Sequence, residues 1–180
     1  DVTLIDTWPD NIDQIKSSGL KISAIEGEFT ITAPALHMGE LSAYGQSFDA
    51  IILSVKSYDT EWAATFAEPY LAPGGFIISA QNSINEEVIA RVVGWSRVVG
   101  CVVTLGAGMY EPGHVQRTSS LDRHSFTIGE PNGRVTPRLN SLAGIMESGG
   151  PTKITTNLWG ERWAKLGTNA MSNALAGITG

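Results

Sequence analysis

The sequence contains a single cysteine, no long apolar run and no recognisable leader. Cys101 lies in an apolar stretch and has no second cysteine to pair with, so we expect a buried, inert thiol in a reducing, cytoplasmic setting. The apolar runs are too short to span the roughly 30 Å of a bilayer's hydrocarbon core. The N-terminus also lacks the basic and apolar regions of a signal peptide. We therefore expect neither a disulfide-stapled secreted domain nor a membrane partner.

Positive charge is scarce as well. The 180 residues carry 12 Lys and Arg against 18 Asp and Glu, a net charge of −6, and the two signs are interspersed. Surfaces that bind nucleic acid need clustered basic side chains, so we expect no nucleic-acid partner and take a small molecule as the default ligand. With 42% apolar residues, the chain is able to bury a substantial core.

Both ends of the sequence fall within expected elements. Residues 2–6 read as a strand with no initiator methionine before it, and the last residues continue an expected helix. We therefore expect the chain to be the interior of a longer protein, lacking the start of its first domain and holding only the beginning of its second.

Apolar runs of strand length alternate with helical patterns in the middle of the chain. The predicted strands are 48–55, 76–80 and 97–105, and the predicted helices are 58–71 and 86–93. The strands are nearly continuous in apolar residues, as in parallel strands that are covered on both faces. The first helix is expected to stop before Pro73-Gly74-Gly75, and the second strand to begin after it. This order indicates an α/β fold with a Rossmann-like, mostly parallel sheet flanked by helices.

The flanking segments extend this pattern. We expect a strand at 2–6, a helix from Pro9 to Gly19 and a hairpin at 20–25 and 29–33. Further along we expect two edge strands, antiparallel or mixed, at 114–118 and 125–129, a helix at 135–146, a strand at 153–155, and a long helix from 158 to about 176. A domain boundary is predicted near residue 156. Residues 1–156 would then form a partial dinucleotide-binding domain, and residues 157–180 would begin a helical domain for substrate binding or dimerisation.

Three polar residues, Asp6, Lys56 and Asn82, stand at the carboxyl ends of predicted strands, where open parallel sheets bind their ligands. Asp6 ends the strand whose acidic residue accepts hydrogen bonds from an adenosine ribose. Each residue also has an ordinary interpretation. Asp6 could be a turn carboxylate ahead of Pro9, Lys56 a solvated lysine, and Asn82 a cap for the helix at 86–93. Their shared placement favours a cofactor site.

The last helix carries Lys165, Asn169 and Asn173 at i, i+4 and i+8, which places one cation and two amides on a single face. Asparagine is a poor helix former, so two in mid-helix call for a reason. A solvent-facing polar stripe is the alternative, although exposed helix faces usually carry Glu, Lys and Gln.

These segments together resemble the ketopantoate reductase (2-dehydropantoate 2-reductase) family. The similarity rests on Trp163-x-Lys165-Leu166-x-x-Asn169-x-x-x-Asn173, on Val55-Lys56-Ser57-Tyr58 and on Gln81-Asn82-Ser83. Weaker matches are Gly113-His114-Val115-Gln116 and Ile128-Gly129. The resemblance implies an oxidoreductase that acts on CH–OH groups and reduces a small 2-keto acid, most simply 2-dehydropantoate to pantoate, with NADPH or NADH.

The resemblance also implies residue roles. Lys165 matches the catalytic lysine that protonates the keto oxygen as hydride arrives, and Asn169 and Asn173 match asparagines that orient the substrate. Asn82 matches a residue between the nicotinamide ribose and the substrate, and Lys56 matches a lysine on the adenine side of the cofactor. No metal ligand is expected, and a homodimer formed through a C-terminal domain is left open.

Three departures from the family pattern bear on specificity. Members that use NADP commonly have an arginine after the second strand, whereas this chain has Asp6-Thr7-Trp8. NAD is therefore a strong candidate for the cofactor, beside the NADP that is usual in the family. Ser83 stands where glycine is usual, and Ala174 where proline is common, which leaves the 2-keto acid open.

Two other functions remain as alternatives. One is another two-domain dehydrogenase, of the opine or 6-phosphogluconate type, which would rely on a histidine or a differently placed lysine. His37, His114 and His124 are not at expected strand ends, which ranks this hypothesis second. The other is a nucleotide-sensing domain without catalysis, against which Lys165 argues.

Overall fold

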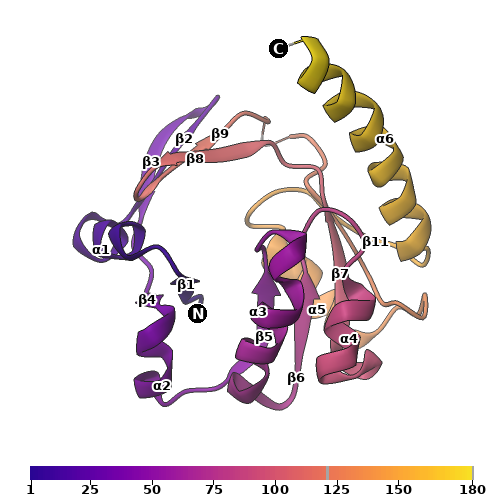
Figure 1. The fold of residues 1–180 in the computed structure, drawn as a ribbon, viewed down its shortest axis with the longest axis horizontal. Coiled ribbons are helices and arrows are strands. Elements are labelled where there is room, and N and C mark those ends of the chain that lie inside the picture. Colours follow the sequence, from indigo (N-terminus) through magenta and orange to yellow (C-terminus); the bar gives the residue numbers. More distant parts are fainter. Residues whose placement is uncertain (121, 180) are drawn as a thin grey trace. The chain divides into compact units, whose positions relative to one another are not determined.

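The structure, a computed structural model, describes residues 1–120 and 122–179, without the side chains of residues 173 and 174. The chain divides into two compact units, each made of two segments: Asp1–Gln46 with Leu105–Arg123, and Ser47–Thr104 with His124–Gly180 (Figure 1). The long helix α6 (Leu158–Thr179) is grouped with the second unit. That residues 157–180 begin a separate helical domain stays a prediction.

The first unit holds a strand pair and a four-stranded sheet. Its elements are β1 (Leu4–Asp6), α1 (Pro9–Ser18), β2 (Leu20–Ala24), β3 (Gly27–Ile31), β4 (Ala35–His37), α2 (Leu41–Tyr44), β8 (Ala107–Glu111) and β9 (His114–Arg117). β1 pairs with β4 in parallel, and the other strands follow the order β3-β2-β9-β8. The expected strand, helix and hairpin at the start of the chain are confirmed.

Helix α1 forms where the sequence places its start and stop signals. Pro9 occupies the first turn, and Gly19 ends the helix with a φ of 80°, a positive value that favours glycine. Its buried face carries Ile12 and Ile15, which pack with Ala35 of β4. This small core fixes α1 beside the strand pair that ends in Asp6.

The strand predicted at residues 114–118 forms in a mixed sheet, but it is not an edge strand, because β9 lies between β2 and β8. β9 pairs in parallel with β2 and antiparallel with β8, and β8 itself was not predicted. Nothing in the local sequence reports that a strand near residue 114 will pair with one near residue 21, since strand pairing is a long-range property.

The second unit is a five-stranded sheet with helices on both faces. Its elements are β5 (Phe48–Leu53), α3 (Thr60–Ala67), β6 (Leu71–Ser79), α4 (Glu86–Val93), β7 (Val98–Val103), β10 (Phe126–Gly129), α5 (Pro137–Met146), β11 (Thr152–Ile154) and α6. The strand order is β11-β10-β7-β6-β5, with β5, β6 and β7 parallel and β10 antiparallel to β7. The predicted α/β fold with a mostly parallel sheet is confirmed.

Alternation along the central strands divides the core into two layers. Ile77 and Val98 point to the layer beneath α3 and α4, whereas their chain neighbours Ile78 and Val99 point to the layer beneath α5. All four side chains are fully buried. Successive side chains of a strand point to opposite faces, so continuous apolar runs are what a strand covered on both faces requires.

Several boundaries differ from those expected. β6 begins at Leu71 and runs through Pro73-Gly74-Gly75, where its register against β5 shifts and Gly74 adopts a φ of 80°. The proline is accommodated at this irregularity of the ladder. The helix ahead of it ends at Ala67, followed by a 3-10 turn.

Two strands also differ from their expected positions in the sheet. β5 was expected to be covered on both faces, but it is the edge strand of its sheet and Ile52 is 50% exposed. β10, expected at an edge, lies between β7 and β11. Within the part of the chain that the structure describes, no helix combines the length and apolar content needed to cross a bilayer.

Candidate active site

Lys165 lies at the carboxyl ends of two neighbouring parallel strands. Its Nζ donates a hydrogen bond to Oδ1 of Asn82, at 2.8 Å, and another to the backbone carbonyl of Val103. Asn82 follows β6, and Val103 is the last residue of β7. The structure therefore joins two of the predicted site residues, one from a strand end and one from the long helix, at the edge of the sheet where such folds bind ligands.

The first turn of α6 is seated on two glycines of the sheet. Gly100 of β7 and Gly129 of β10 are cross-strand partners, and Leu158, 1% exposed, packs over both. A Cβ added at Gly129 would lie 2.9 Å from Thr155 Cγ2 and 3.2 Å from Leu158 Cβ, closer than ordinary packing allows. The glycines thus let the helix approach the sheet closely.

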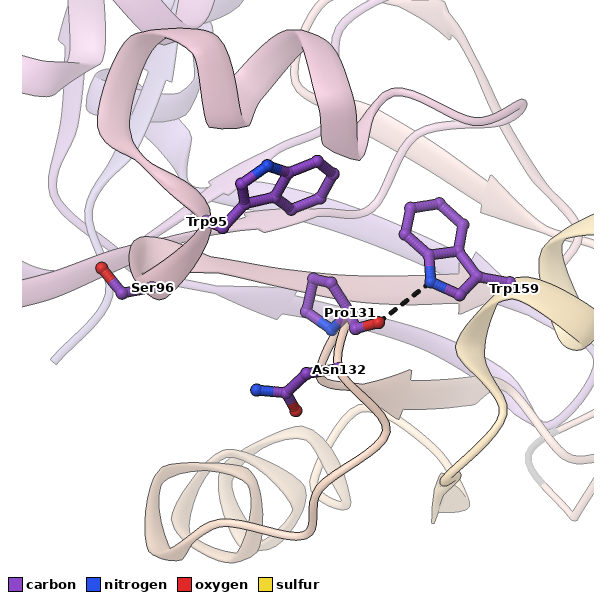
Figure 2. A pocket seen from close by; sticks show the side chains of 5 residues that line it. All are labelled: Trp95, Ser96, Pro131, Asn132 and Trp159. Carbon is purple, nitrogen blue, oxygen red and sulfur yellow. Dashed lines mark hydrogen bonds between the residues drawn. The ribbon is translucent and has the colours of Figure 1, made fainter.

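Trp159 adds a second attachment in the same turn. Its indole Nε1 donates to the carbonyl of Pro131 at 2.9 Å, and its ring meets Trp95 edge to face with centroids 6.3 Å apart (Figure 2). A hollow of about 440 Å³ lies between these residues, lined also by Ser96 and Asn132. Its lining holds neither an ionisable side chain nor a predicted site residue, so we assign this hollow no part in the chemistry.

Arg162, one turn before Lys165, makes a buried network that the sequence did not reveal. Its guanidinium, 2% exposed, pairs with the fully buried carboxylate of Glu86 in α4. It also donates to the carbonyls of Ser79 and Gln81, both at 2.8 Å, and to the Ser79 hydroxyl. A signal was present, because Glu86 shares the apolar face of α4 with Ile89, Ala90 and Val93, where a carboxylate needs a partner.

The surroundings of Lys165 alter its acidity. Partial burial lowers the pKa of its ammonium below the ordinary lysine value, the nearby charge of Arg162 lowers it further, and Cys101 opposes these effects. Burial also raises the pKa of the Cys101 thiol to about 11. Cys101 is therefore the buried, protonated thiol that the sequence predicted, and Lys165 is a stronger acid than a solvated lysine.

Asn82 is held by the loop that contains it and does not cap α4. The N-cap residue of α4 is Asn85, so the capping interpretation of Asn82 was wrong. The Asn82 carbonyl accepts hydrogen bonds from Ser57 Oγ at 2.9 Å and from Asn85 Nδ2 at 2.8 Å. These bonds leave the Asn82 side chain to receive Lys165.

Ser83, the residue after Asn82, has a backbone conformation that favours glycine. It has a φ of 74° and, among the described residues, is the one non-glycine with a positive φ. A positive φ of this kind costs a residue with a Cβ about 1–2 kcal/mol. A strained turn beside Asn82 is typical of a functional loop.

Lys56 lies in the loop after β5, which contacts the Asn82 loop. Gln81 Nε2 donates to the Val55 carbonyl at 2.9 Å, and Ser57 reaches the Asn82 carbonyl. The Lys56 side chain is exposed, and β5 ends three residues earlier, at Leu53. The structure brings the Lys56 and Asn82 loops together, while the role of Lys56 on the adenine side of a cofactor stays a prediction.

Asp6 ends β1 in the first unit and is held in a fixed orientation. Its Oδ1 accepts from the Trp8 backbone N–H at 3.1 Å, and its Oδ2 accepts from Asn11 Nδ2 at 2.8 Å. This is the geometry of the turn carboxylate considered as the ordinary interpretation. It leaves room for a ribose contact, because each carboxylate oxygen has a further lone pair.

The structure describes the side chain of only one of the two predicted asparagines of α6. Asn169 lies one turn beyond Lys165 on the same helix and is partly buried. Asn173 lies within α6, but its side chain is outside the described part of the structure. That Asn169 and Asn173 contact the substrate therefore stays a prediction.

Comparisons with known proteins identify the family. Residues 1–133 match the family model described as ketopantoate reductase PanE/ApbA. The chain is 33% identical over 180 residues to a 2-dehydropantoate 2-reductase of Pyrococcus horikoshii, covering 99% of this chain and 56% of the relative. It spans about half the length of the curated relatives it matches.

Solved structures show the same fold. The 2-dehydropantoate 2-reductase of Geobacter metallireducens GS-15 is 26% identical with a TM-score of 0.79, over 92% of this chain and 54% of the other. A D-mandelate dehydrogenase solved with NADH and anilino(oxo)acetate is 22% identical with a TM-score of 0.81, over 93% and 53%. The second likeness, at this identity, supports the fold alone.

Proposed function

The chain belongs to the ketopantoate reductase family, and on that premise we propose that the full-length protein reduces a small 2-keto acid to a 2-hydroxy acid with a nicotinamide cofactor. The first candidate substrate is 2-dehydropantoate, which would become pantoate. The observation that carries the proposal is the Lys165 ammonium, held at the ends of β6 and β7 against Asn82 Oδ1.

Lys165 would act as the general acid. A ketone that becomes an alkoxide develops negative charge on its oxygen, and a fixed ammonium stabilises that charge more than it stabilises the starting ketone. The nicotinamide, when bound, would supply the hydride to the keto carbon. Lys165 Nζ then gives its proton to the former keto oxygen, and its lowered pKa brings it closer to the value suited to proton transfer near neutral pH.

The remaining predicted residues would bind and orient. Asn169 and Asn173 would hold the carboxylate and hydroxyl groups of the substrate on the Lys165 face of α6. Asn82 would donate its amide N–H to the ribose or the substrate while its Oδ1 holds Lys165. Lys56, exposed on the neighbouring loop, would neutralise the adenosine phosphates.

We propose NADH as the preferred cofactor, because Asp6 is a fixed carboxylate at a strand end. It fits the hydroxyls of an unphosphorylated ribose as an acceptor and repels a 2′-phosphate. The one basic side chain of α1, Lys16, is already paired with Glu40 at 2.7 Å. A 2′-phosphate would thus meet the negative charge of Asp6 without help from Lys16.

Fluorescence titration of the full-length protein with NADH and NADPH tests this preference without turnover. Asp6→Asn should raise the NADPH affinity relative to NADH by about tenfold, or roughly 1.4 kcal/mol. Asp13→Asn, an exposed carboxylate on α1, is the matched control and should leave the ratio unchanged. Tighter binding of NADPH than of NADH by the unaltered protein would overturn the preference.

The catalytic proposal is tested by replacing Lys165 in the full-length protein. Lys165→Ala should lower kcat for 2-keto acid reduction by about 10²- to 10⁴-fold, the usual contribution of a positioned acid, with cofactor affinity little changed. Lys153→Ala is the matched control, because Lys153 makes only an exposed ion pair with Glu161 of α6. Activity should be followed as cofactor oxidation with 2-dehydropantoate and with aliphatic and aryl 2-keto acids.

Three outcomes separate the hypotheses. Turnover that depends on Lys165 supports the reductase. Cofactor binding without turnover of any keto acid by the unaltered protein supports the nucleotide-sensing alternative. An aryl keto acid preferred over 2-dehydropantoate would place the chain nearer in specificity to the D-mandelate dehydrogenase that shares its fold.

A further inference from the structure

Arg162 is the last buried residue of α6 within the described part of the helix. Beyond it, Lys165, Leu166 and Asn169 are partly covered, and most of the remaining side chains are exposed, including Met171 at 67% and Leu175 at 64%. The position of Lys165 is therefore set by the contacts of Leu158, Trp159 and Arg162, of which Arg162 is the nearest.

The Arg162 guanidinium donates a hydrogen bond to the same loop that Lys165 contacts. Arg162 Nη1 donates to the carbonyl of Gln81, and Lys165 Nζ donates to the side chain of the next residue, Asn82. Arg162 and Lys165 lie about 4.5 Å apart along the helix axis. Two donors from one helix turn thus hold two consecutive residues of one loop, and any shift of α6 along the loop would break both contacts.

We propose that Arg162 is a positioning residue for the reaction: locked between Glu86 and the carbonyls of Ser79 and Gln81, it holds α6 so that the Lys165 ammonium stays at Asn82. The kinetic part of this inference rests on the proposed function. The positional part rests on the hydrogen bonds alone.

Stability alone does not account for the pair. A buried ion pair is often no more stabilising than apolar side chains of the same volume, because both charges lose their hydration. What a guanidinium adds is direction, since its planar fork donates in fixed geometry to several acceptors at once. Arg162 uses Nε, Nη1 and Nη2 on partners from two segments, the end of β6 and α4.

The charge of Arg162 acts on Lys165 as well. The groups that affect the pKa of Lys165 are Arg162 on the same helix, which lowers it, and Cys101 on β7, which raises it, in addition to burial. Removing the Arg162 charge should therefore raise the pKa of Lys165. Replacing Arg162 by lysine should keep the positive charge and lose only the planar, multiple-donor geometry of the guanidinium.

Two variants of the full-length protein separate geometry from charge. Arg162→Lys should lower kcat at least about tenfold, since misplacing a reacting group by 1 Å can cost about 10²-fold, and should leave the KM for cofactor within about twofold. The double variant Glu86→Gln/Arg162→Met removes both charges together, which avoids leaving either one buried alone. It should lower kcat similarly, and by freeing α6 it should expose the Lys165 ammonium and raise its pKa, because burial is the largest of the effects that lower that pKa.

The matched control is Arg138→Lys. Arg138 also pairs with a buried carboxylate, Glu130, and donates to the carbonyls of Ser96 and Val98, but it does so at the opposite end of β7 from Val103. Arg138→Lys should lower the Tm without changing kcat per folded molecule. The pKa of Lys165 is measured by an NMR titration of lysine side chains labelled with ¹⁵N, with the Lys165 signal assigned by its loss in Lys165→Ala.

The proposal is overturned if kcat falls only in proportion to lost folded protein, or if Arg138→Lys lowers it equally. It is also overturned if both Arg162 variants retain kcat within about twofold. Should the unaltered protein reduce no keto acid, the proposed function fails, and the titration then decides the inference alone. A Lys165 pKa that is the same in the double variant and the unaltered protein contradicts it.

Discussion

The contact of Leu158 with Gly100 should appear as a large coupling in a double-mutant cycle. A methyl group added at Gly100 would collide with the Leu158 side chain and lie 2.9 Å from Glu86 Oε1. Overpacking of this kind destabilises by about 1–3 kcal/mol. Leu158→Ala should cost about 2–5 kcal/mol, because Leu158 is 1% exposed and its loss leaves a cavity.

The two changes, Gly100→Ala and Leu158→Ala, should partly compensate when combined. Truncating Leu158 vacates the space that the methyl group added at Gly100 needs, so the double variant should be more stable than the sum of the single effects by at least about 1 kcal/mol. Compensation remains incomplete, because the Glu86 oxygen stays close to the added methyl. The four proteins are compared by urea unfolding, followed by far-UV circular dichroism, with the slopes checked for agreement.

A glycine replacement without a clash provides the control. Gly144, in the exposed part of α5, has no atom within 4 Å of an added Cβ, so Gly144→Ala should stabilise the protein by up to about 1 kcal/mol. Additivity of the Gly100 and Leu158 effects to within about 0.5 kcal/mol would refute the packing argument.

Other predictions concern the loop, the thiol and the pH dependence. Ser83→Gly should stabilise the protein by about 1 kcal/mol in the same unfolding assay, because it relieves a φ of 74°, and Ser83→Ala should give no gain. Cys101, buried with a pKa of about 11, should not react with a thiol reagent at pH 8 until the protein unfolds; rapid reaction in the folded state would contradict its placement. Because the reaction needs Lys165 protonated and its pKa is lowered, kcat should fall with rising pH at a lower pH than for an ordinary lysine, and a profile flat to pH 10.5 would argue against Lys165 as the acid.

The parts of the fold that follow from local pattern were predictable. The parallel strands β5, β6 and β7 are apolar runs of strand length, and α1 and α4 have clear ends. Pro73-Gly74-Gly75 misled the prediction because such residues usually stop an element, whereas here they lie in a strand at a register shift. The partners of β9 depended on contacts between residues far apart in sequence.

The site was predictable to a similar degree. Lys165 and Asn82 were identified from a family motif and from strand-end placement, and the structure joins them. Arg162 escaped because an arginine within a long helix is ordinarily a surface residue, and only the tertiary fold places Ser79, Gln81 and Glu86 around it. Glu86 on the apolar face of α4 indicated that a buried partner was needed, but the partner is set by the packing of several elements and could not be read from one segment.

Because α6 is anchored only near its start, a tilt of the helix displaces its far end more than it displaces residues near the anchor. The 17 residues that follow Arg162, up to Thr179, span about 26 Å, whereas Lys165 lies only about 4.5 Å from the anchored residue. A tilt of about 10° would move the far end by roughly 4 Å and the lysine by less than about 1 Å. The distal part of the helix can thus tilt several times further than the lysine moves.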